Sequence, residues 1–120
     1  MANILIVDDS KTSRKILKEM LEDAGHTVIA ECLNGEEGYL KYKELKPDLV
    51  TLDITMPKLD GLEALQLIKK SDEDAKVVMI TAASQKEKMI QAIKYGAAEF
   101  IAKPYDGDEV KQVINKVLNS

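Results

Sequence analysis

Five short apolar runs alternate with amphipathic stretches along the chain, and this alternation constrains the fold more than any other feature. The runs cover residues 4–7, 28–32, 49–52, 77–80 and 99–102. Their hydrophobicity is continuous, as it is in strands whose two faces are both covered. The stretches between them repeat apolar residues at helical spacing. Strand–helix alternation predicts a parallel sheet with right-handed crossovers and with helices on both faces.

The predicted helices have apolar faces and stop signals. Gly25, Pro47 and Gly96 are expected to end the first, second and fourth helices. Asp60 and Gly61 precede the third helix. The apolar faces are expected to consist of Ile16, Leu17, Met20, Leu21 and Ala24; Tyr39, Leu40, Tyr42 and Leu45; Leu62, Leu65 and Ile68; Met89, Ile90 and Ile93; and Val110, Val113, Ile114, Val117 and Leu118.

Length and composition indicate one ordinary globular domain over residues 1–120. The net charge of −4 argues against non-specific nucleic-acid binding. No apolar stretch approaches the roughly 20 residues that span a bilayer, and the N-terminus turns acidic too early for a signal peptide. Cys32 is the only cysteine, so no intrachain disulfide can form and a cytoplasmic location is expected. We expect Cys32 to be buried, and His26 and Met56 to lie outside the core.

Five polar residues follow or end the predicted strands. Asp8 and Asp9 follow the first, Asp53 and Thr81 follow the third and fourth, and Lys103 follows the fifth. In parallel α/β folds the ligand site lies outside the carboxyl ends of the strands, so these side chains are expected at one edge of the sheet. Acids packed closely resist ionising together, and a divalent cation removes that penalty. The pattern predicts a small Mg²⁺ site for phosphate chemistry.

The chemistry expected at this edge is phosphoryl transfer. Asp53 is the candidate nucleophile, because a carboxylate can accept a phosphoryl group as an acyl phosphate. Lys103 supplies a positive charge and Thr81 a hydroxyl donor, while backbone N–H groups after Asp53 and after Thr81 supply the remaining donors. Each residue alone has a simpler interpretation: Asp9 or Ser10 can cap the following helix, for example. It is their convergence that favours the site.

Motifs in receiver order run over essentially the whole chain. They include Ile-Val-Asp-Asp-Ser at 6–10, Pro-Asp at 47–48, Asp-Ile-Thr-Met-Pro at 53–57, Asp-Gly at 60–61, Ile-Thr-Ala at 80–82, Gly-Ala at 96–97 and Lys-Pro-Tyr at 103–105. The chain therefore resembles the response-regulator receiver family. Within that family it is most similar to stand-alone chemotaxis regulators of the CheY type.

The resemblance implies a fold and a function. The fold is flavodoxin-like, an α/β three-layer sandwich with five parallel strands in the order 2-1-3-4-5 and five helices. The function is a signalling switch rather than an enzyme: a histidine kinase donates a phosphoryl group to Asp53 with Mg²⁺. By the family pattern Asp9, Asp53 and the Thr55 backbone carbonyl ligate the metal, Asp8 assists through water, and Thr81 and Lys103 bind phosphoryl oxygens.

The resemblance to the receiver family also implies roles for several further residues. Thr81 is expected to couple to Phe100, where many receivers have tyrosine, so switching would act through packing alone. The Lys103–Pro104 bond is expected to be cis. Thr55 and Ala83 occupy positions that tune phosphoryl lifetime, and neither can orient water as an acid or an amide.

The output surface is expected on the fourth helix, fifth strand and fifth helix. An acidic partner helix, such as a flagellar motor switch protein, or a second copy of the chain would dock there; the chain is expected to be monomeric before activation and to bind neither nucleic acid nor membrane. The residues expected on this surface are Lys86, Lys88, Lys94, Tyr95, Tyr105 and Lys111.

Three rival hypotheses remain open at this point. A haloacid-dehalogenase-type phosphohydrolase also uses an aspartate nucleophile and Mg²⁺, although it has Asp-x-Asp after the first strand. A flavodoxin-type FMN carrier would need a glycine in the phosphate loop, where this chain has Ser10, Thr12 and Ser13. The third is a receiver module of a phosphorelay or of a longer regulator, although Met1 and the end at Ser120 favour a complete chain.

Overall fold

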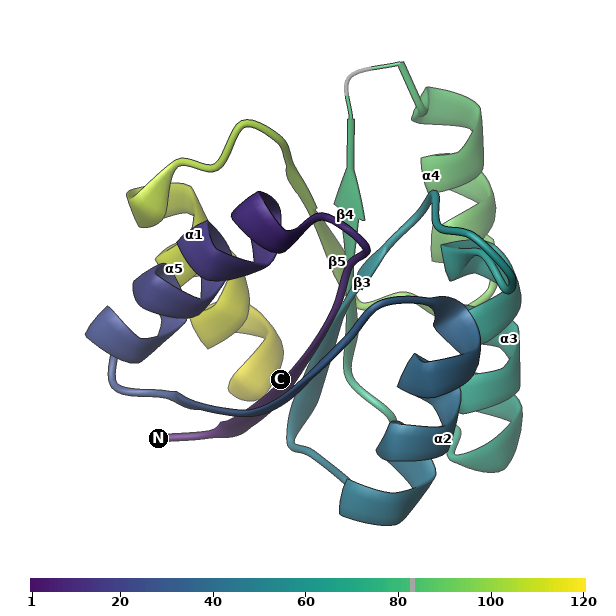
Figure 1. Ribbon diagram of the computed structural model, residues 1–120, viewed down its shortest axis with the longest axis horizontal. Coiled ribbons are helices and arrows are strands. Elements are labelled where there is room, and N and C mark those ends of the chain that lie inside the picture. The colour runs from purple at the N-terminus through teal and green to yellow at the C-terminus, as the bar shows by residue number, and fades with distance from the viewer. Residues whose placement is uncertain (83) are drawn as a thin grey trace.

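The computed structural model describes residues 1–82 and 84–120, and within them strands and helices alternate strictly (Figure 1). Every predicted strand and helix is present, and each strand begins and ends within one residue of its prediction. The elements are β1 (Asn3–Val7), α1 (Lys11–Asp23), β2 (Thr27–Cys32), α2 (Gly35–Leu45), β3 (Leu49–Asp53), α3 (Gly61–Ser71), β4 (Val77–Thr81), α4 (Lys86–Lys94), β5 (Glu99–Ala102) and α5 (Gly107–Leu118).

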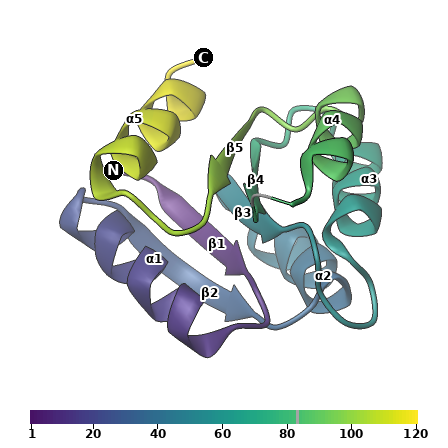
Figure 2. The same ribbon diagram turned by 90° about the horizontal axis from the view of Figure 1, so that it is seen from above.

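The sheet is parallel throughout and has the order β2-β1-β3-β4-β5, which confirms the predicted topology. Helices α1 and α5 cover one face, and α2, α3 and α4 cover the other (Figure 2). The pairing of Asp53 with Ile80 and of Thr81 with Ala102 brings the ends of the last three strands level with one another.

The strands contribute alternate residues to two separate cores. In β1, Ile4 and Ile6 pack toward α1 and α5, while Leu5 and Val7 pack toward α2 and α3. All four side chains are fully buried. Burying such a side chain contributes about 1.5–3 kcal/mol, so both layers of helices are held by the same central strand.

Glycines end two helices at the edge of the sheet opposite the site, and capping side chains begin the helices at the functional edge. Gly25 (φ 93°) and Gly96 (φ 100°) adopt the left-handed conformation expected of helix stops. Asp60 begins α3 with a capping box. The Asp60 side chain accepts a hydrogen bond from the Glu63 backbone N–H, and the Glu63 side chain accepts one from the Asp60 backbone N–H. Helices α1, α2 and α5 likewise start at a side chain that accepts a hydrogen bond from the first turn, from Ser10, Asn34 and Asp106 respectively.

Five residues assigned to apolar helix faces are exposed instead: Ile16, Leu40, Leu45, Ile90 and Ile93. The buried stripe of α1, α2 and α4 is narrower than the sequence pattern suggested, and in α2 and α4 small residues lie on the buried side. In α2, a Cβ on Gly38 would lie 2.8 Å from Val7, and in α4 Ala92 is fully buried. The flanking large residues then project past the edge of the contact.

Two smaller expectations were also wrong. His26 is buried rather than on the surface, because its Nδ1 atom accepts a hydrogen bond from the Ala2 backbone at 3.2 Å. Met56 packs into the core beneath α3 although it lies in a loop. Cys32 is buried, and the Lys103–Pro104 bond is cis, as predicted.

Within the described residues no helix is both long and apolar enough to cross a membrane. The cytoplasmic location expected from the sequence stays a prediction.

Candidate functional site

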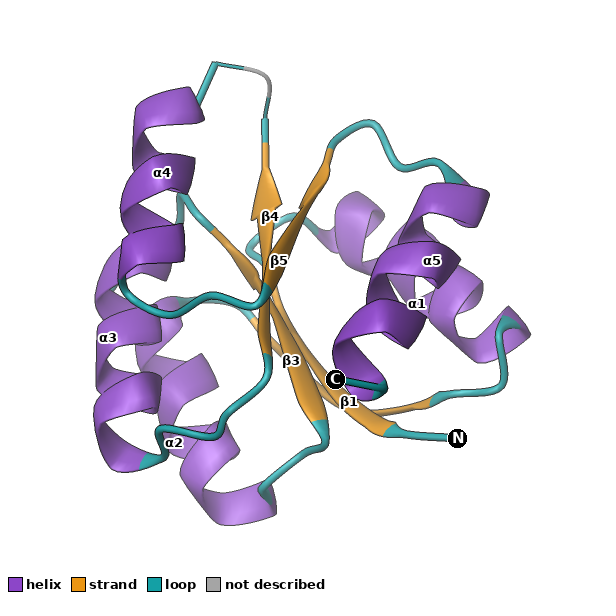
Figure 3. Ribbon diagram, turned by 180° about the vertical axis from the view of Figure 1, so that it is seen from behind, coloured by secondary structure: helices purple, strands orange, loops and turns teal. Residues whose placement is uncertain are grey.

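All five predicted site residues lie at the carboxyl ends of neighbouring strands. Asp8 and Asp9 directly follow β1, Asp53 and Thr81 are the last residues of β3 and β4, and Lys103 directly follows β5. Since all the strands are parallel, their carboxyl ends share one edge of the sheet (Figure 3). Topology alone therefore assembles the site from segments that are far apart in the sequence.

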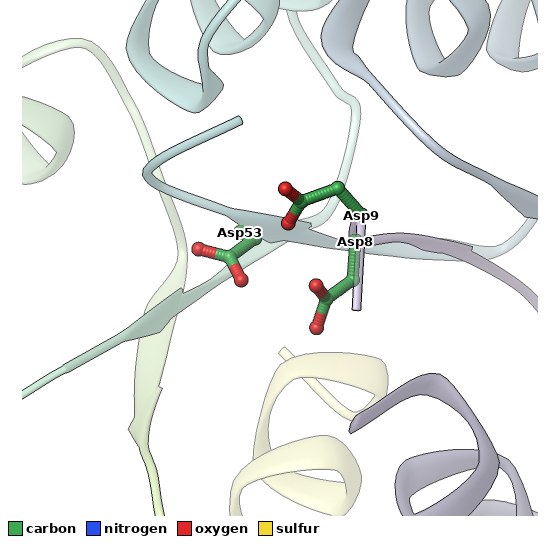
Figure 4. A group of neighbouring side chains, drawn as sticks. All are labelled: Asp8, Asp9 and Asp53. Carbon is green, nitrogen blue, oxygen red and sulfur yellow. The ribbon is translucent and has the colours of Figure 1, made fainter. Parts of the chain in front are cut away.

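The three acids form a compact cluster at the ends of β1 and β3 (Figure 4). One carboxylate oxygen from each of Asp8, Asp9 and Asp53 lies within 4.8 Å of the others. Asp8 and Asp53 are buried, whereas Asp9 is exposed. The cluster therefore opens to solvent on the side of Asp9.

Lys103 bridges the two buried acids. Its Nζ atom lies 2.9 Å from Asp53 Oδ2 and 3.2 Å from Asp8 Oδ2. Burial raises the pKa of Asp53; the Lys103 hydrogen bond opposes this rise, and the charge of Asp8 adds to it. Burial alone would lower the pKa of Lys103, but its contacts with Asp53 and Asp8 outweigh burial and raise the pKa. Lys103 is therefore a stable cation beside a carboxyl group whose pKa lies above its ordinary value.

The two oxygens of Asp8 have different surroundings. Oδ1 accepts a hydrogen bond from the Ser10 backbone at 2.8 Å. Oδ2 is buried and, although close to Lys103, receives no aligned hydrogen bond from the described part of the chain. The ion pair with Lys103 leaves this buried oxygen without a hydrogen bond, which is costly unless another group binds it. Together with the oxygens of Asp9 and Asp53, it forms an all-oxygen set suited to a divalent cation such as Mg²⁺.

The loop after β3 fixes the Asp53 carboxyl group. The Thr55 backbone donates to Asp53 Oδ1 at 3.1 Å, and Gly61 donates to Ile54 O at 2.7 Å. The start of α3 lies so close that a Cβ on Gly61 would be 2.0 Å from the Asp53 carbonyl oxygen. Glycine is thus required here by the close approach of two backbones. The metal-ligand role of the Thr55 carbonyl stays a prediction, and Ala83 lies outside the described residues.

Thr81 is buried at the end of β4, and its hydroxyl faces the following loop. It donates to the Ala82 carbonyl at 3.0 Å and lies 3.4 Å from Gln85 Oε1. Thr81 and Phe100 line the same shallow hollow between β4, α4 and β5. The structure thus brings the predicted switch pair together, with Phe100 partly exposed.

Five of the six residues predicted for a partner surface lie on or beside α4 and α5. Helices α4 and α5 lie on opposite faces of the sheet, with β5 at the edge between them (Figure 3). Helix α4 also exposes Ile90 and Ile93, which the sequence analysis had placed on an apolar, core-facing side. Of the predicted residues, Lys86, Lys88 and Lys94 are in α4, Tyr95 follows its end, and Lys111 is in α5.

The sixth residue, Tyr105, is connected to a different element. Its hydroxyl lies 3.0 Å from Ser13 Oγ at the start of α1. Burial raises the pKa of Tyr105, and the Ser13 hydrogen bond only partly opposes this rise. Tyr105 therefore links the loop after β5 to α1.

Two contributors to the site were missed by the sequence analysis. Arg14 donates to the Asp8 carbonyl at 2.8 Å and pairs with Glu31 at 3.2 Å, which fixes the backbone between the two acids. Gln85 accepts from Ala82 N at 2.8 Å. No local pattern indicates these roles in full, because Arg14 also pairs with Glu31 and Gln85 also donates to Thr55, both far away along the chain.

Comparison with known proteins agrees with this geometry. The family model of the response regulator receiver domain matches residues 4–115. The chain belongs to the response regulator receiver family. It is 48% identical over 116 residues to the chemotaxis protein CheY of Bacillus subtilis, with 97% of each chain covered. It is 46% identical to the CheY of Thermotoga maritima, with 95% of each covered.

The receiver fold is equally clear in solved structures. The CheY structure from Borrelia burgdorferi, solved as a complex with CheX, BeF3 and Mg²⁺, has a TM-score of 0.91 and 40% identity. The alignment covers 96% of this chain and 87% of that one. Receiver domains take phosphoryl groups from histidine kinases and act on downstream targets. Membership of this family favours the receiver over the phosphohydrolase and flavin-carrier hypotheses.

Proposed function

We propose that this receiver domain accepts a phosphoryl group on Asp53 and thereby switches its affinity for a protein target in chemotaxis signalling. The observation that carries the proposal is the surroundings of the Asp53 carboxylate. It is buried at the strand ends, with oxygens of Asp8 and Asp9 within 4.8 Å and Lys103 at 2.9 Å. Relatives named CheY, at 46–48% identity over nearly the whole chain, support the chemotaxis role.

The reaction we propose moves the phosphoryl group from a kinase phosphohistidine to Asp53. A carboxylate oxygen of Asp53 attacks phosphorus, an O–P bond forms, and the P–N bond to the imidazole breaks with its electron pair returning to nitrogen. Little covalent chemistry is required of the protein beyond positioning and charge stabilisation. Thr55 N–H orients the attacking carboxylate, and Lys103 moves from pairing with Asp53 to pairing with a phosphoryl oxygen.

The same residues are proposed to hold Mg²⁺. When ionised, the three acids and Lys103 carry a net charge of about −2, which a divalent cation neutralises. Asp8, Asp9, Asp53 and the Thr55 backbone carbonyl would hold the ion, and its bound form would reduce the repulsion between Asp53 and the incoming phosphate. Burial and the charge of Asp8 raise the pKa of Asp53, and a bound cation would favour its ionised form.

We propose that the chain acts as a switch and not as an enzyme with a free substrate. Its own chemistry would be limited to autophosphorylation and autodephosphorylation at Asp53. The binding partners would be a histidine kinase, as phosphodonor, and a target such as a flagellar motor switch protein. A monomeric state before activation stays a prediction.

The test is gel mobility on a phosphate-affinity matrix after incubation with acetyl phosphate, with and without Mg²⁺. The native chain and an Asp23→Asn control, altered at an exposed position at the end of α1, are expected to give a Mg²⁺-dependent shifted band. Asp53→Asn is expected to give none. A shifted band that persists in Asp53→Asn would refute Asp53 as the acceptor.

The proposed role in chemotaxis is tested by binding to a target protein. The phosphorylated chain is expected to bind a flagellar motor switch protein more tightly than the unphosphorylated chain does, and Asp53→Asn is expected not to respond to phosphodonor. Equal binding by both forms of the native chain would overturn the proposed output.

A further inference from the structure

Gln85 precedes α4 but does not act as that helix's cap. Helices α1, α2, α3 and α5 each begin at a side chain that accepts a hydrogen bond from their own first turn. Among the described residues, the Gln85 side chain makes no such bond to α4. It extends instead toward the functional edge of the sheet, so its contacts there require a separate explanation.

The amide oxygen of Gln85 faces two donors at the end of β4. Oε1 accepts from the Ala82 backbone N–H at 2.8 Å and lies 3.4 Å from the Thr81 hydroxyl. Thr81 also donates to the Ala82 carbonyl at 3.0 Å. A hydroxyl has one proton to donate, so these contacts occupy it fully. The Ala82 N–H is not available to another acceptor while Gln85 keeps this position, and the nearer acceptor for the Thr81 hydroxyl is the Ala82 carbonyl.

These two donors are the ones that a phosphoryl group on Asp53 needs. Thr81 is the last residue of β4, which pairs directly with β3, where Asp53 ends the strand. A phosphoryl group presents several anionic oxygens, and the hydroxyl of Thr81 and the N–H after it are the donors that β4 offers to them. The Gln85 amide oxygen therefore accepts from a backbone N–H that β4 would otherwise offer to a phosphoryl oxygen.

The amide nitrogen of Gln85 reaches the opposite loop. Nε2 donates to the Thr55 hydroxyl, and the backbone of Thr55 donates to Asp53 Oδ1 at 3.1 Å. One side chain thus connects the loop after β4 to the loop after β3, and both loops lie at the same end of the sheet (Figure 1). The contact spans the approach to Asp53.

We propose that Gln85 is an internal competitor of the phosphoryl group, which must displace the Gln85 amide from Ala82, Thr81 and Thr55 before the phosphorylated state can form. This inference rests on the proposed function. Gln85 is a positioning residue in this account, because it acts through donors that contact the phosphoryl group. These contacts favour the unphosphorylated conformation. The apparent affinity for a phosphoryl group is therefore lowered in proportion to the fraction of molecules in which the Gln85 contacts are broken.

The sign of the effect separates this proposal from a purely structural role. A competitor, once removed, leaves the Ala82 N–H free, so Gln85→Ala should bind a phosphoryl analogue more tightly. One net hydrogen bond corresponds to roughly a fivefold change in an equilibrium constant. If Gln85 only held the two loops together, its removal would loosen the site and weaken binding instead.

The experiment measures the affinity for beryllofluoride, an analogue of the phosphoryl group, at saturating Mg²⁺, followed by backbone amide NMR signals. The native chain is compared with Gln85→Ala, Gln85→Glu and the control Gln91→Ala, which alters an exposed glutamine of the same helix. We expect roughly fivefold tighter binding for Gln85→Ala and no change for Gln91→Ala. Gln85→Glu should bind more weakly than the native chain, because it places a negative charge on the same donors.

A second readout needs neither beryllofluoride nor Mg²⁺. In Gln85→Ala alone, without any ligand, the Ala82 amide loses its acceptor, so its NMR signal should shift while the thermal unfolding midpoint stays close to that of the native chain. Unchanged or weaker beryllofluoride binding by a folded Gln85→Ala, or an unmoved Ala82 signal, would overturn the competitor. Failure of the native chain and of all variants to bind beryllofluoride would refute the proposed function as well.

Discussion

Gly61 and Gly107 offer a matched pair of substitutions that tests how the backbone is packed around Asp53. Each is the first residue of its helix and follows a capping aspartate. A Cβ on Gly61 would lie 2.0 Å from the carbonyl oxygen of Asp53 and 2.7 Å from Ile54 Cα. A Cβ on Gly107 would have nothing within 4 Å.

The expected magnitudes follow from these distances. Carbon atoms pack comfortably at about 3.5–4.0 Å, so Gly61→Ala must move α3 or the end of β3 by more than about 1 Å. The neighbours are backbone atoms of a buried strand, so the free energy of unfolding should fall by about 3 kcal/mol or more, at the upper end of overpacking. Gly107→Ala should instead raise it by about 0.4–1 kcal/mol, because alanine restricts the unfolded chain.

Urea unfolding of both variants measures these changes, and the initial rate of phosphorylation by acetyl phosphate measures the second consequence. Since the clash involves the backbone of the phosphoacceptor, Gly61→Ala should also slow phosphorylation of the folded fraction by at least about tenfold. The close approach of α3 to Asp53 is wrong if the free energies of unfolding of the two variants differ by less than about 0.5 kcal/mol and both are phosphorylated equally fast.

Three further predictions concern other parts of the molecule. The Thr51 hydroxyl is fully buried and without a partner in residues 1–82 and 84–120, so Thr51→Val should raise the free energy of unfolding by about 1 kcal/mol in urea titrations. Burial, together with the charge of the N-terminal amino group, lowers the pKa of His26 from 6.5 in the folded chain. Below pH 6.5 His26 therefore binds protons more readily in the unfolded chain, and the free energy of unfolding should fall as the pH drops through 6.5. His26→Asn, which keeps an acceptor for Ala2 N–H, should remove this part of the pH dependence of unfolding. Mg²⁺ at about 100 times its dissociation constant should add about 2.7 kcal/mol to the stability of the native chain and much less to that of Asp8→Asn, as measured by the urea midpoint.

The strands could be predicted closely because parallel strands covered on both faces are continuously apolar. Each run is bounded by polar or turn-forming residues, and right-handed crossovers then place the connecting helices on the faces of the sheet. The convergence of Asp8, Asp53 and Lys103 also followed from topology alone, since three strand ends at one edge leave no other arrangement. The strongest sequence signals were therefore those that depend on chain direction rather than on side-chain packing.

The failures had a different origin. His26 follows a helix-ending glycine and looks like a surface residue, but its burial depends on a hydrogen bond to Ala2, which is 24 residues away. Ile90 and Ile93 have helical spacing, yet both are exposed and the small Ala92 is the fully buried residue of α4. Periodicity indicates which residues share a face, but not how wide a contact the neighbouring layer allows.

Gln85 shows the same limit at the functional site. In sequence it is one polar residue among several before a helix, and a capping role is the simplest expectation. Its actual partners, Ala82 and Thr55, are fixed by the paths of two loops. Thr55 itself cannot act as an amide, but the fold places the amide of Gln85 against its hydroxyl.

The central claim, that Asp53 carries the phosphoryl group, is tested most directly by chemical trapping. Borohydride reduces an acyl phosphate of aspartate to homoserine, and peptide mass spectrometry then locates the reduced residue. After incubation with acetyl phosphate and Mg²⁺, the account predicts homoserine at position 53 and at neither position 8 nor position 9. Reduction at Asp8 or Asp9, or reduction at position 53 without phosphodonor, would contradict it.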